Sequence, residues 1–366
     1  MQPLQNHPML AESRLPSVTW TEYPPPQDLP PVQIGDPALP LISIVTPSFN
    51  QGTFISETIE SVLHQPYPNI EYWVIDGGST DETLDVLRRY EHDPRFHWLS
   101  EPDRGQSDAI NKGWSRCRGD ILAWLNSDDY YEPDIFSAVV KEFCTHSSLG
   151  LVYGEVRTVT STGQLVRTMG YRVTPEQMLT ELIAPFQATT FFHHAAVQLA
   201  GPIDLSLHYG MDADFLLRLM ANVPYRFLPR VIANYRLHQT SKTVTAKSKF
   251  VYEKLTVLEK ILAHRNQYPA FLPYSEAELR SKFYRLASKM LYTEGAMTES
   301  LFYLDRAVRV YPASWKTIAQ HDVPRWLMRW LLPSALYEQL IALMYRGRRA
   351  MRLAKTRLRS LSSSSV

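Results

Sequence analysis

The chain has 366 residues, 45% hydrophobic and 20% charged, which is typical of a folded globular protein. A net charge of +1 excludes the strongly basic class that binds nucleic acid, and two cysteines, Cys117 and Cys144, exclude a disulfide framework or a cysteine-rich zinc module. There is neither a secretory signal pattern nor a run of about 18 apolar residues, so we expect a cytoplasmic protein without a spanning helix.

The first segment, residues 1–40, holds ten of the 26 prolines. Proline fixes φ and lacks an amide donor, so this segment is expected to be an extended or disordered arm. A covering arm, a flexible leader and a docking ligand for a partner all fit this composition.

Residues 41–130 alternate between two patterns. Short apolar, β-branched runs occupy 41–46, 70–75, 96–99 and 121–125, and helical stretches at 54–65, 81–90 and 106–117 separate them. Continuous apolar runs of this length are typical of strands buried on both faces of a sheet. The alternation predicts a doubly wound α/β layer.

Residues 150–240 follow a less regular α+β pattern. The pattern predicts a hairpin from 151–160 and 164–171 around Gly163, a helix at 211–220 and a strand at 225–235. The remaining residues, 246–366, are predicted to be helical, with a helical pair at 276–312 that turns at Gly295.

Polar clusters follow three of the apolar runs, at 47–50, 76–81 and 126–129. Ligands of open α/β sheets bind beyond the carboxyl ends of the strands, so this rim is a candidate pocket rich in oxygen atoms. Asp128 and Asp129 are adjacent carboxylates that a hard cation such as Mg²⁺ or Mn²⁺ would stabilise. A solvated turn before the next helix is the alternative interpretation.

Other residues suit a nucleotide. Asp76, beside two glycines, could accept hydrogen bonds from a base or ribose, and Arg104 precedes a helix whose N-terminus favours anions. Neither GxGxxG after a strand nor GxxxxGK[ST] occurs, which argues against dehydrogenases and P-loop proteins. Asp212 is a candidate general base or an acidic helix start, and His238 a candidate ligand or a structural histidine.

Five segments together resemble the family-2 glycosyltransferases of the GT-A fold, especially bacterial enzymes of surface polysaccharide synthesis. They are IVTPSFNQ, VIDGGSTDET, SEPDRGQSDAINKGW, GDILAWLNSDD and YGMDADFLLRL, spread over residues 40–240. The resemblance implies a GT-A glycosyltransferase domain at 41–245, with a nucleotide-binding half at 41–130 and an acceptor half at 131–245. A helical C-terminal region, 246–366, would follow it.

The resemblance also implies roles for single residues. Pro47, Asn50 and Asp76 would line the nucleoside pocket, usually for uridine, and Asp108 would lie near the ribose or sugar. Gln187 would face the sugar or the acceptor.

The resemblance also implies which residues bind the metal ion and which one acts as the catalytic base. Asp128 would bind Mn²⁺ or Mg²⁺, with Asp129 secondary, and His238 would approach the diphosphate or the metal. Asp212 would be the catalytic base. Asn126 stands where the metal motif often starts with an acid, and Ala213 replaces an aromatic residue.

We therefore expect an inverting, metal-dependent glycosyltransferase of the hexosyltransferase type (EC 2.4). It would move a sugar from a nucleotide-diphosphate donor, usually a UDP-sugar, to a hydroxyl of a glycan or lipid-linked acceptor. Two alternatives stay open. A sugar nucleotidyltransferase would need a basic loop, but TPSFNQG contains neither Lys nor Arg. A catalytically idle scaffold would fit the changes at Asn126 and Ala213.

The C-terminal tail suggests a location. Residues 339–366 contain seven basic residues and no acid, and Trp326 and Trp330 lie just upstream. This pattern predicts peripheral contact with an anionic membrane at its inner face, and a packed terminal helix with a solvated basic end is the alternative.

Overall fold

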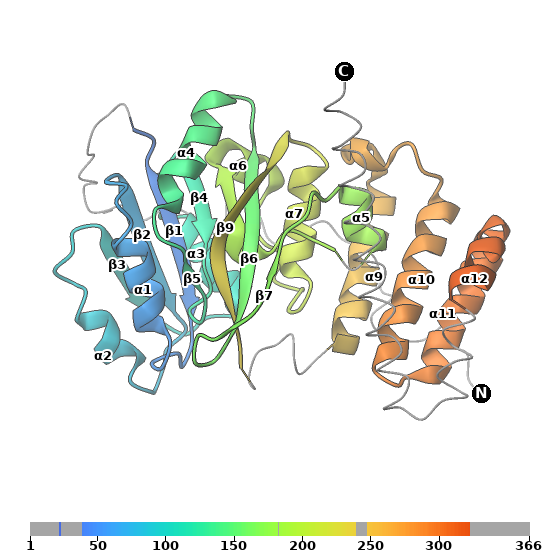
Figure 1. Cartoon of the computed structure of the whole chain (residues 1–366), viewed down its shortest axis with the longest axis horizontal. Coiled ribbons are helices and arrows are strands. Elements are labelled where there is room, and N and C mark those ends of the chain that lie inside the picture. Colours follow the sequence, from blue (N-terminus) through green and yellow to red (C-terminus); the bar gives the residue numbers. More distant parts are fainter. Residues whose placement is uncertain (1–21, 23–38, 182, 239–246, 323–366) are drawn as a thin grey trace, which may run out of the picture.

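The computed structural model describes residue 22 and residues 39–181, 183–238 and 247–322. The predicted arm at 1–40 lies almost wholly outside these ranges, as do the basic tail at 339–366 and the predicted boundary at 245. Figure 1 shows a twisted sheet with helices on both of its faces, and a layer of further helices beside it.

The first half alternates strands and helices in chain order. The elements are β1 (Ile42–Ser48), α1 (Ile55–Leu63), β2 (Ile70–Asp76), α2 (Thr83–Arg88), β3 (Phe96–Ser100), α3 (Gln106–Trp114) and β4 (Ile121–Trp124). The four strands and three helices predicted for residues 41–125 are confirmed. The helix predicted from residue 81 begins later, because the carboxylate of Asp81 accepts the Thr83 amide at 3.0 Å and so stands before the helix.

The second half mixes short and long elements. They are β5 (Tyr130–Tyr131), α4 (Ile135–Thr145), β6 (Leu151–Thr160), β7 (Leu165–Met169), α5 (Pro175–Thr180), β8 (Thr190–His193), α6 (His194–Ala200), α7 (Met211–Met220) and β9 (Tyr225–Leu237). The hairpin around Gly163, whose φ is 80°, is confirmed, as are the predicted helix α7 and strand β9.

The sheet is mixed. Its strand order is β3-β2-β1-β4-β8-β6-β9-β5, and β7 pairs with β6 beside this path. Neighbours among β1 to β4 run parallel, and β8 runs antiparallel to both β4 and β6. The carboxyl ends of β1, β2 and β4 therefore share one edge, as the polar clusters that follow them require.

Both faces of the sheet are buried. Neighbouring residues of β1 enter different cores: Ile44 packs with α1 and α4, and Val45 packs with α3 and α7. A Cβ at Gly113 of α3 would lie 2.4 Å from Val45 Cγ1, so glycine allows α3 to approach the sheet closely. Burial on both faces is the physical reason that these strands read as continuous apolar runs.

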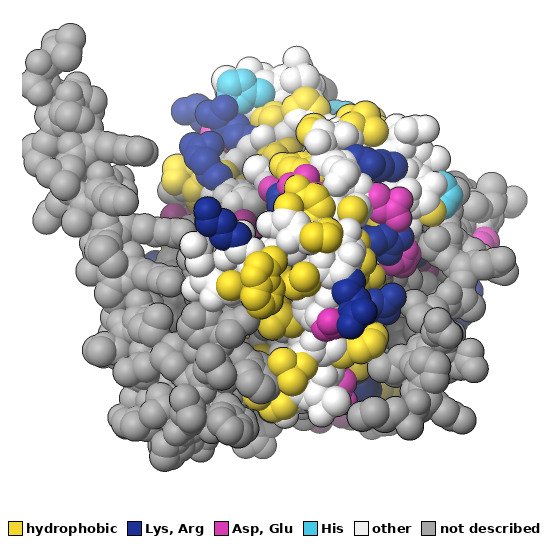
Figure 2. Space-filling model, turned by 90° about the vertical axis from the view of Figure 1, so that its right-hand side faces the viewer, with side chains coloured by type: hydrophobic (Ala, Val, Ile, Leu, Met, Phe, Trp, Pro, Cys, Tyr) yellow, Lys and Arg dark blue, Asp and Glu magenta, His cyan; other side chains and the backbone are white. Residues whose placement is uncertain are grey.

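The helical layer consists of α9 (Lys247–Ala263), α10 (Glu276–Thr293), α11 (Met297–Val310) and α12 (Trp315–His321). The predicted helical pair is confirmed, with Gly295 at φ 84° in its turn. Val45, Phe215 of α7 and Phe283 of α10 belong to one hydrophobic cluster, so this layer shares a core with the sheet. On its outer face, hydrophobic and basic side chains lie interspersed (Figure 2). Trp315, the first residue of α12, is exposed.

Within the ranges described, no helix is long and apolar enough to cross a membrane.

Candidate active site

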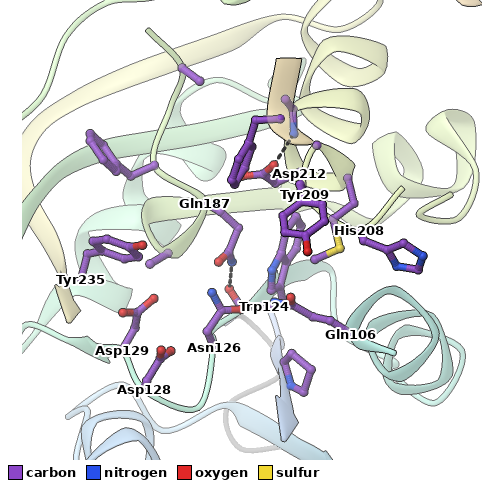
Figure 3. A pocket seen from close by; sticks show the side chains of 18 of the residues that line it. Gln106, Trp124, Asn126, Asp128, Asp129, Gln187, His208, Tyr209, Asp212 and Tyr235 are labelled. Carbon is purple, nitrogen blue, oxygen red and sulfur yellow. Dashed lines mark hydrogen bonds between the residues drawn. The ribbon is translucent and has the colours of Figure 1, made fainter. Parts of the chain in front are cut away.

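A cavity of about 1120 Å³ opens at the carboxyl edge of the sheet. Its wall includes the end of β1, the segment after β4, the first turn of α7 and residues of α9 and α10. Figure 3 shows Asp128 and Asp129 on one side of this cavity and Asp212 with Tyr209 on the other, with Gln187 between them in that view.

The cavity brings together most of the residues predicted for the site. Those that line it are Pro47, Asp128, Asp129, Gln187, Asp212 and His238. Those that do not are Asn50, Asp76, Arg104 and Asp108, and their polar atoms bind neighbouring parts of the chain. The binding roles of both groups remain predictions.

Asp76 organises the loop that follows β2. Its fully buried carboxylate accepts the backbone N–H groups of Gly78 and Ser79 at 3.1 and 2.8 Å. It also accepts the hydroxyls of Ser79 and Ser100. In this structure Asp76 therefore shapes the loop, and neighbouring Gly77 lines the cavity in its place.

Asn50, Arg104 and Asp108 also bind within the protein. The Asn50 side chain accepts the Thr80 amide at 2.9 Å, which ties the loop after β1 to the loop after β2. Asp108, buried at the start of α3, accepts the Arg104 guanidinium and backbone amide. Such a carboxylate in the first turn of a helix is favourable.

The acidic cluster after β4 has two distinct carboxylates. Asp128 is half-buried, and its Oδ2 lies 2.8 Å from His238 Nε2, so β9 brings the histidine to the acid. Asp129 is 1% exposed; its Oδ1 accepts the Arg236 amide at 3.0 Å, and its Oδ2 lacks a hydrogen-bond partner. Burial and the nearby charge of Asp128 raise the pKa of Asp129 well above its usual range.

Arg236 stabilises this cluster by hydrogen bonds and was not predicted as a site residue from the sequence. Its Nε donates to the Asp128 carbonyl at 3.0 Å, and its Nη2 binds the Glu57 carboxylate. The guanidinium also lies over the rings of Phe54 and Tyr130, at 5.1 and 5.2 Å. An arginine two residues before His238 was visible in the sequence, but its burial was not.

Two amide side chains that line the cavity hydrogen-bond the chain around the end of β4. Gln187 donates from Nε2 to the Trp124 carbonyl at the end of β4. Gln106, at the start of α3, donates to Asn126 Oδ1 at 2.8 Å. These bonds fix the chain on both sides of the acidic cluster. The Asn126 side chain also lowers the pKa of Asp129, where an acid in its place would add a third negative charge.

Asp212 lies across the cavity, in the first turn of α7. Burial raises the pKa of its carboxyl, while the Ala213 N–H at 2.7 Å and the charge of Lys254 oppose this shift. Lys254 comes from α9 and lines the same cavity, and burial lowers the pKa of its amine. Lys254 was not predicted from the sequence, since no local signal links a lysine of α9 to an acid 42 positions earlier.

The chain matches the family model "Glycosyl transferase family 2" over residues 43–199. It is 30% identical over 210 residues to the chondroitin synthase of Pasteurella multocida, across 56% of this chain and 22% of that protein. The chain thus spans less than a quarter of the length of this curated relative.

Two solved structures share the fold. The mannosyltransferase PcManGT from Pyrobaculum calidifontis, in complex with GDP-Man and Mn²⁺, aligns with a TM-score of 0.55 and 17% identity, over 87% of this chain and 90% of that one. S. aureus TarS 1–349, in complex with UDP-GlcNAc, aligns with a TM-score of 0.51 and 15% identity, over 76% and 92%. The predicted GT-A fold is confirmed, and residues 43–199 are similar in sequence to the family-2 glycosyltransferases.

Proposed function

We propose that this protein is an inverting, metal-dependent glycosyltransferase of bacterial surface polysaccharide synthesis. It would move a sugar from a nucleotide-diphosphate donor, a UDP-sugar in our proposal, to a hydroxyl of a glycan or lipid-linked acceptor. One observation carries the proposal: a single cavity holds an acid–histidine cluster at the edge of the sheet and, across from it, a separate half-buried carboxylate.

The donor is proposed to bind between the ends of β1 and β4. Pro47 and Gly77 line this part of the cavity. PcManGT and TarS were solved with GDP-Man and UDP-GlcNAc, and both molecules are nucleotide-diphosphate sugars. The lining residues numbered 47–129 include neither Lys nor Arg, and the cationic side chains of the cavity come from later in the chain, at Arg167 and Lys254. The loop after β1 thus lacks the basic residues with which a nucleotidyltransferase would hold a triphosphate. This argues against a nucleotidyltransferase.

The cluster after β4 fits a hard divalent cation. Asp128 and His238 supply a carboxylate oxygen and an imidazole nitrogen, and the buried Oδ2 of Asp129 lacks a partner that a cation or a proton would provide. Among the described residues no three acidic, histidine or cysteine side chains form a ready metal site. In our proposal the substrate phosphates supply further ligands to Mg²⁺ or Mn²⁺. When bound, the ion would neutralise charge on the departing nucleoside diphosphate.

Asp212 is proposed to be the general base. The acceptor oxygen attacks the anomeric carbon, the bond from that carbon to the diphosphate oxygen breaks, and the acceptor's proton passes to Asp212. Because burial raises the pKa of Asp212, its carboxylate is a stronger base than an exposed one. A single displacement of this kind inverts the anomeric centre.

The acceptor is proposed to enter beside Asp212. Tyr209 and Phe250, which contact each other, line the cavity near this helix start, and Tyr171, Ile183, Phe186 and Met290 add further aromatic and aliphatic lining. Tyr171 and Phe186 lie with ring centroids 6.5 Å apart. Aromatic faces suit the apolar faces of sugar rings as well as a lipid chain.

The test is a panel of nucleotide sugars, with glycan and lipid-linked acceptors, assayed with Mn²⁺ and after chelation. We expect release of a nucleoside diphosphate that depends on the divalent ion and rises when an acceptor is present. Consumption of a nucleoside triphosphate and a sugar phosphate would instead indicate a nucleotidyltransferase. Failure to turn over any donor would indicate a scaffold.

We also propose peripheral docking on anionic membrane through the basic tail, which the sequence predicts and which lies outside the described residues. Flotation with liposomes that contain anionic lipid should carry the full chain upward. Replacing the seven basic residues of 339–366 by glutamine should abolish this. Flotation that does not depend on anionic lipid would contradict the proposal.

A further inference from the structure

The turn that leads into Asp212 is held by an acid from a different part of the chain. Glu253 of α9 is buried, and its carboxylate accepts three consecutive backbone N–H groups. The distances to Oε2 are 3.0 Å from His208, 2.6 Å from Tyr209 and 2.7 Å from Gly210. One carboxylate thus determines the path of the chain immediately before α7.

These amides belong to the N-cap position of α7 and to the two residues before it, so they lie on the segment that leads into the helix. Gly210 is the N-cap residue and has no side chain that could accept them. The positive end of the helix dipole also favours an anion at this place. Glu253 therefore fixes, from a different helix, the path by which the chain enters α7, and Asp212 follows two residues after the N-cap.

Helix α9 also contacts Tyr209, which lines the cavity. Lys249 Nζ lies 3.2 Å from the Tyr209 hydroxyl, and the Phe250 ring meets the Tyr209 ring edge-on at 5.5 Å between centroids. Phe250 and Lys254 line the cavity themselves. One side of α9 is thus built around the turn at 208–212, although α9 lies outside the segment that matches the family model.

We propose that Glu253 is a positioning residue for glycosyl transfer: its carboxylate holds the turn at 208–210 so that Asp212 faces the cavity. The inference rests on the proposed function, in which Asp212 takes the acceptor's proton. The helical C-terminal region is then a part of the active site.

The substitution Glu253→Gln tests the positioning role, because glutamine has nearly the same size and shape as glutamate. Its amide oxygen can still accept, but its NH₂ group would face N–H donors, so the turn loses part of its support. A displacement of about 1 Å at a reacting group can lower a rate about 100-fold, so we expect the kcat for transfer to fall about 10- to 100-fold. The dissociation constant for UDP with Mn²⁺ should stay within about twofold of wild type, because the donor binds at the other end of the cavity.

The matched control is Glu259→Gln on the same helix. The Glu259 carboxylate binds Arg280 of α10, so its loss weakens the packing of α9 without touching the turn. We expect a comparable fall in melting temperature and a wild-type kcat. Amide hydrogen exchange gives a second readout: residues 209 and 210 should exchange faster in Glu253→Gln than in Glu259→Gln. Glu253→Asp, which keeps the charge on a shorter side chain, should recover part of the kcat.

The outcomes separate the two proposals. A wild-type chain that transfers sugar, with an unchanged kcat in Glu253→Gln, would overturn the role of Glu253 alone. Equal losses of kcat in Glu253→Gln and Glu259→Gln would show that α9 acts only through stability, and would also overturn it. Failure of the wild-type chain to transfer from any donor would overturn the proposed function and this role together.

Discussion

Asparagine at position 212 separates the chemistry of the proposed base from its structural role. Asp212 Oδ1 accepts the Ala213 N–H at 2.7 Å, and an asparagine can present its own carbonyl oxygen to that amide. The turn before α7 is held independently by Glu253. Asp212→Asn should therefore leave the fold and donor binding near wild type while removing the basic oxygen.

The expected loss of kcat follows from the contribution that a general base makes to a reaction rate. Such groups contribute about 100- to 10,000-fold to a rate, so kcat in Asp212→Asn should fall by that factor. This corresponds to about 2.7 to 5.4 kcal/mol of barrier, at about 1.36 kcal/mol for each tenfold. Steady-state release of nucleoside diphosphate in the presence of acceptor measures it. Calorimetry with UDP and Mn²⁺ serves as the control for donor binding.

The pH profile adds a second test. Burial raises the pKa of Asp212, and the charges of Lys254 and Glu253 on α9 act on it in opposite directions. Because the base works deprotonated, transfer by wild type should rise with pH through this raised pKa, and Asp212→Asn should lack that rise. Unchanged turnover in the variant, or the same rising limb in both proteins, would refute the assignment of the base.

Three further predictions follow from other contacts. Asp128→Asn should weaken binding of UDP in the presence of Mn²⁺ roughly tenfold or more, by calorimetry, and leave it unchanged after chelation; equal affinities in Mn²⁺ would contradict the metal role. Arg236→Met should lower the free energy of unfolding by about 2–4 kcal/mol in denaturant titration, since it removes bonds to Glu57 and to the Asp128 carbonyl; a loss under about 0.5 kcal/mol would contradict this. Gly113→Ala should cost about 1–3 kcal/mol by the same measurement, because its Cβ would lie 2.4 Å from Val45 Cγ1, and an unchanged midpoint would show that α3 can shift.

The role of the C-terminal helices changes how the chain divides. Sequence patterning separates residues 246–366 from the α/β part, but Lys254 lines the cavity and Glu253 holds the turn that leads into α7. Lys260 of the same helix also binds Asp204, in the loop between α6 and α7. Deleting these helices would therefore remove part of the proposed acceptor end together with a structural layer.

The sequence alone determined the order and type of the main elements and placed the proposed acids on one edge. Strands buried on both faces read as apolar runs, and the polar residues after β1, β2 and β4 share an edge because parallel strands end together. Asp128 and Asp212 could be selected as candidates because the motifs around them are local.

Only the tertiary structure decided which polar groups face the cavity. Asp76 and Asp108 were predicted to contact the donor, as Asp128 was predicted to bind the metal, yet the carboxylates of Asp76 and Asp108 accept hydrogen bonds from within the chain. Arg236 and Glu253 act across distances of more than 40 residues, where periodicity carries no information. A side chain's direction and its partners arise from packing between elements, so they appear only when the elements have been assembled.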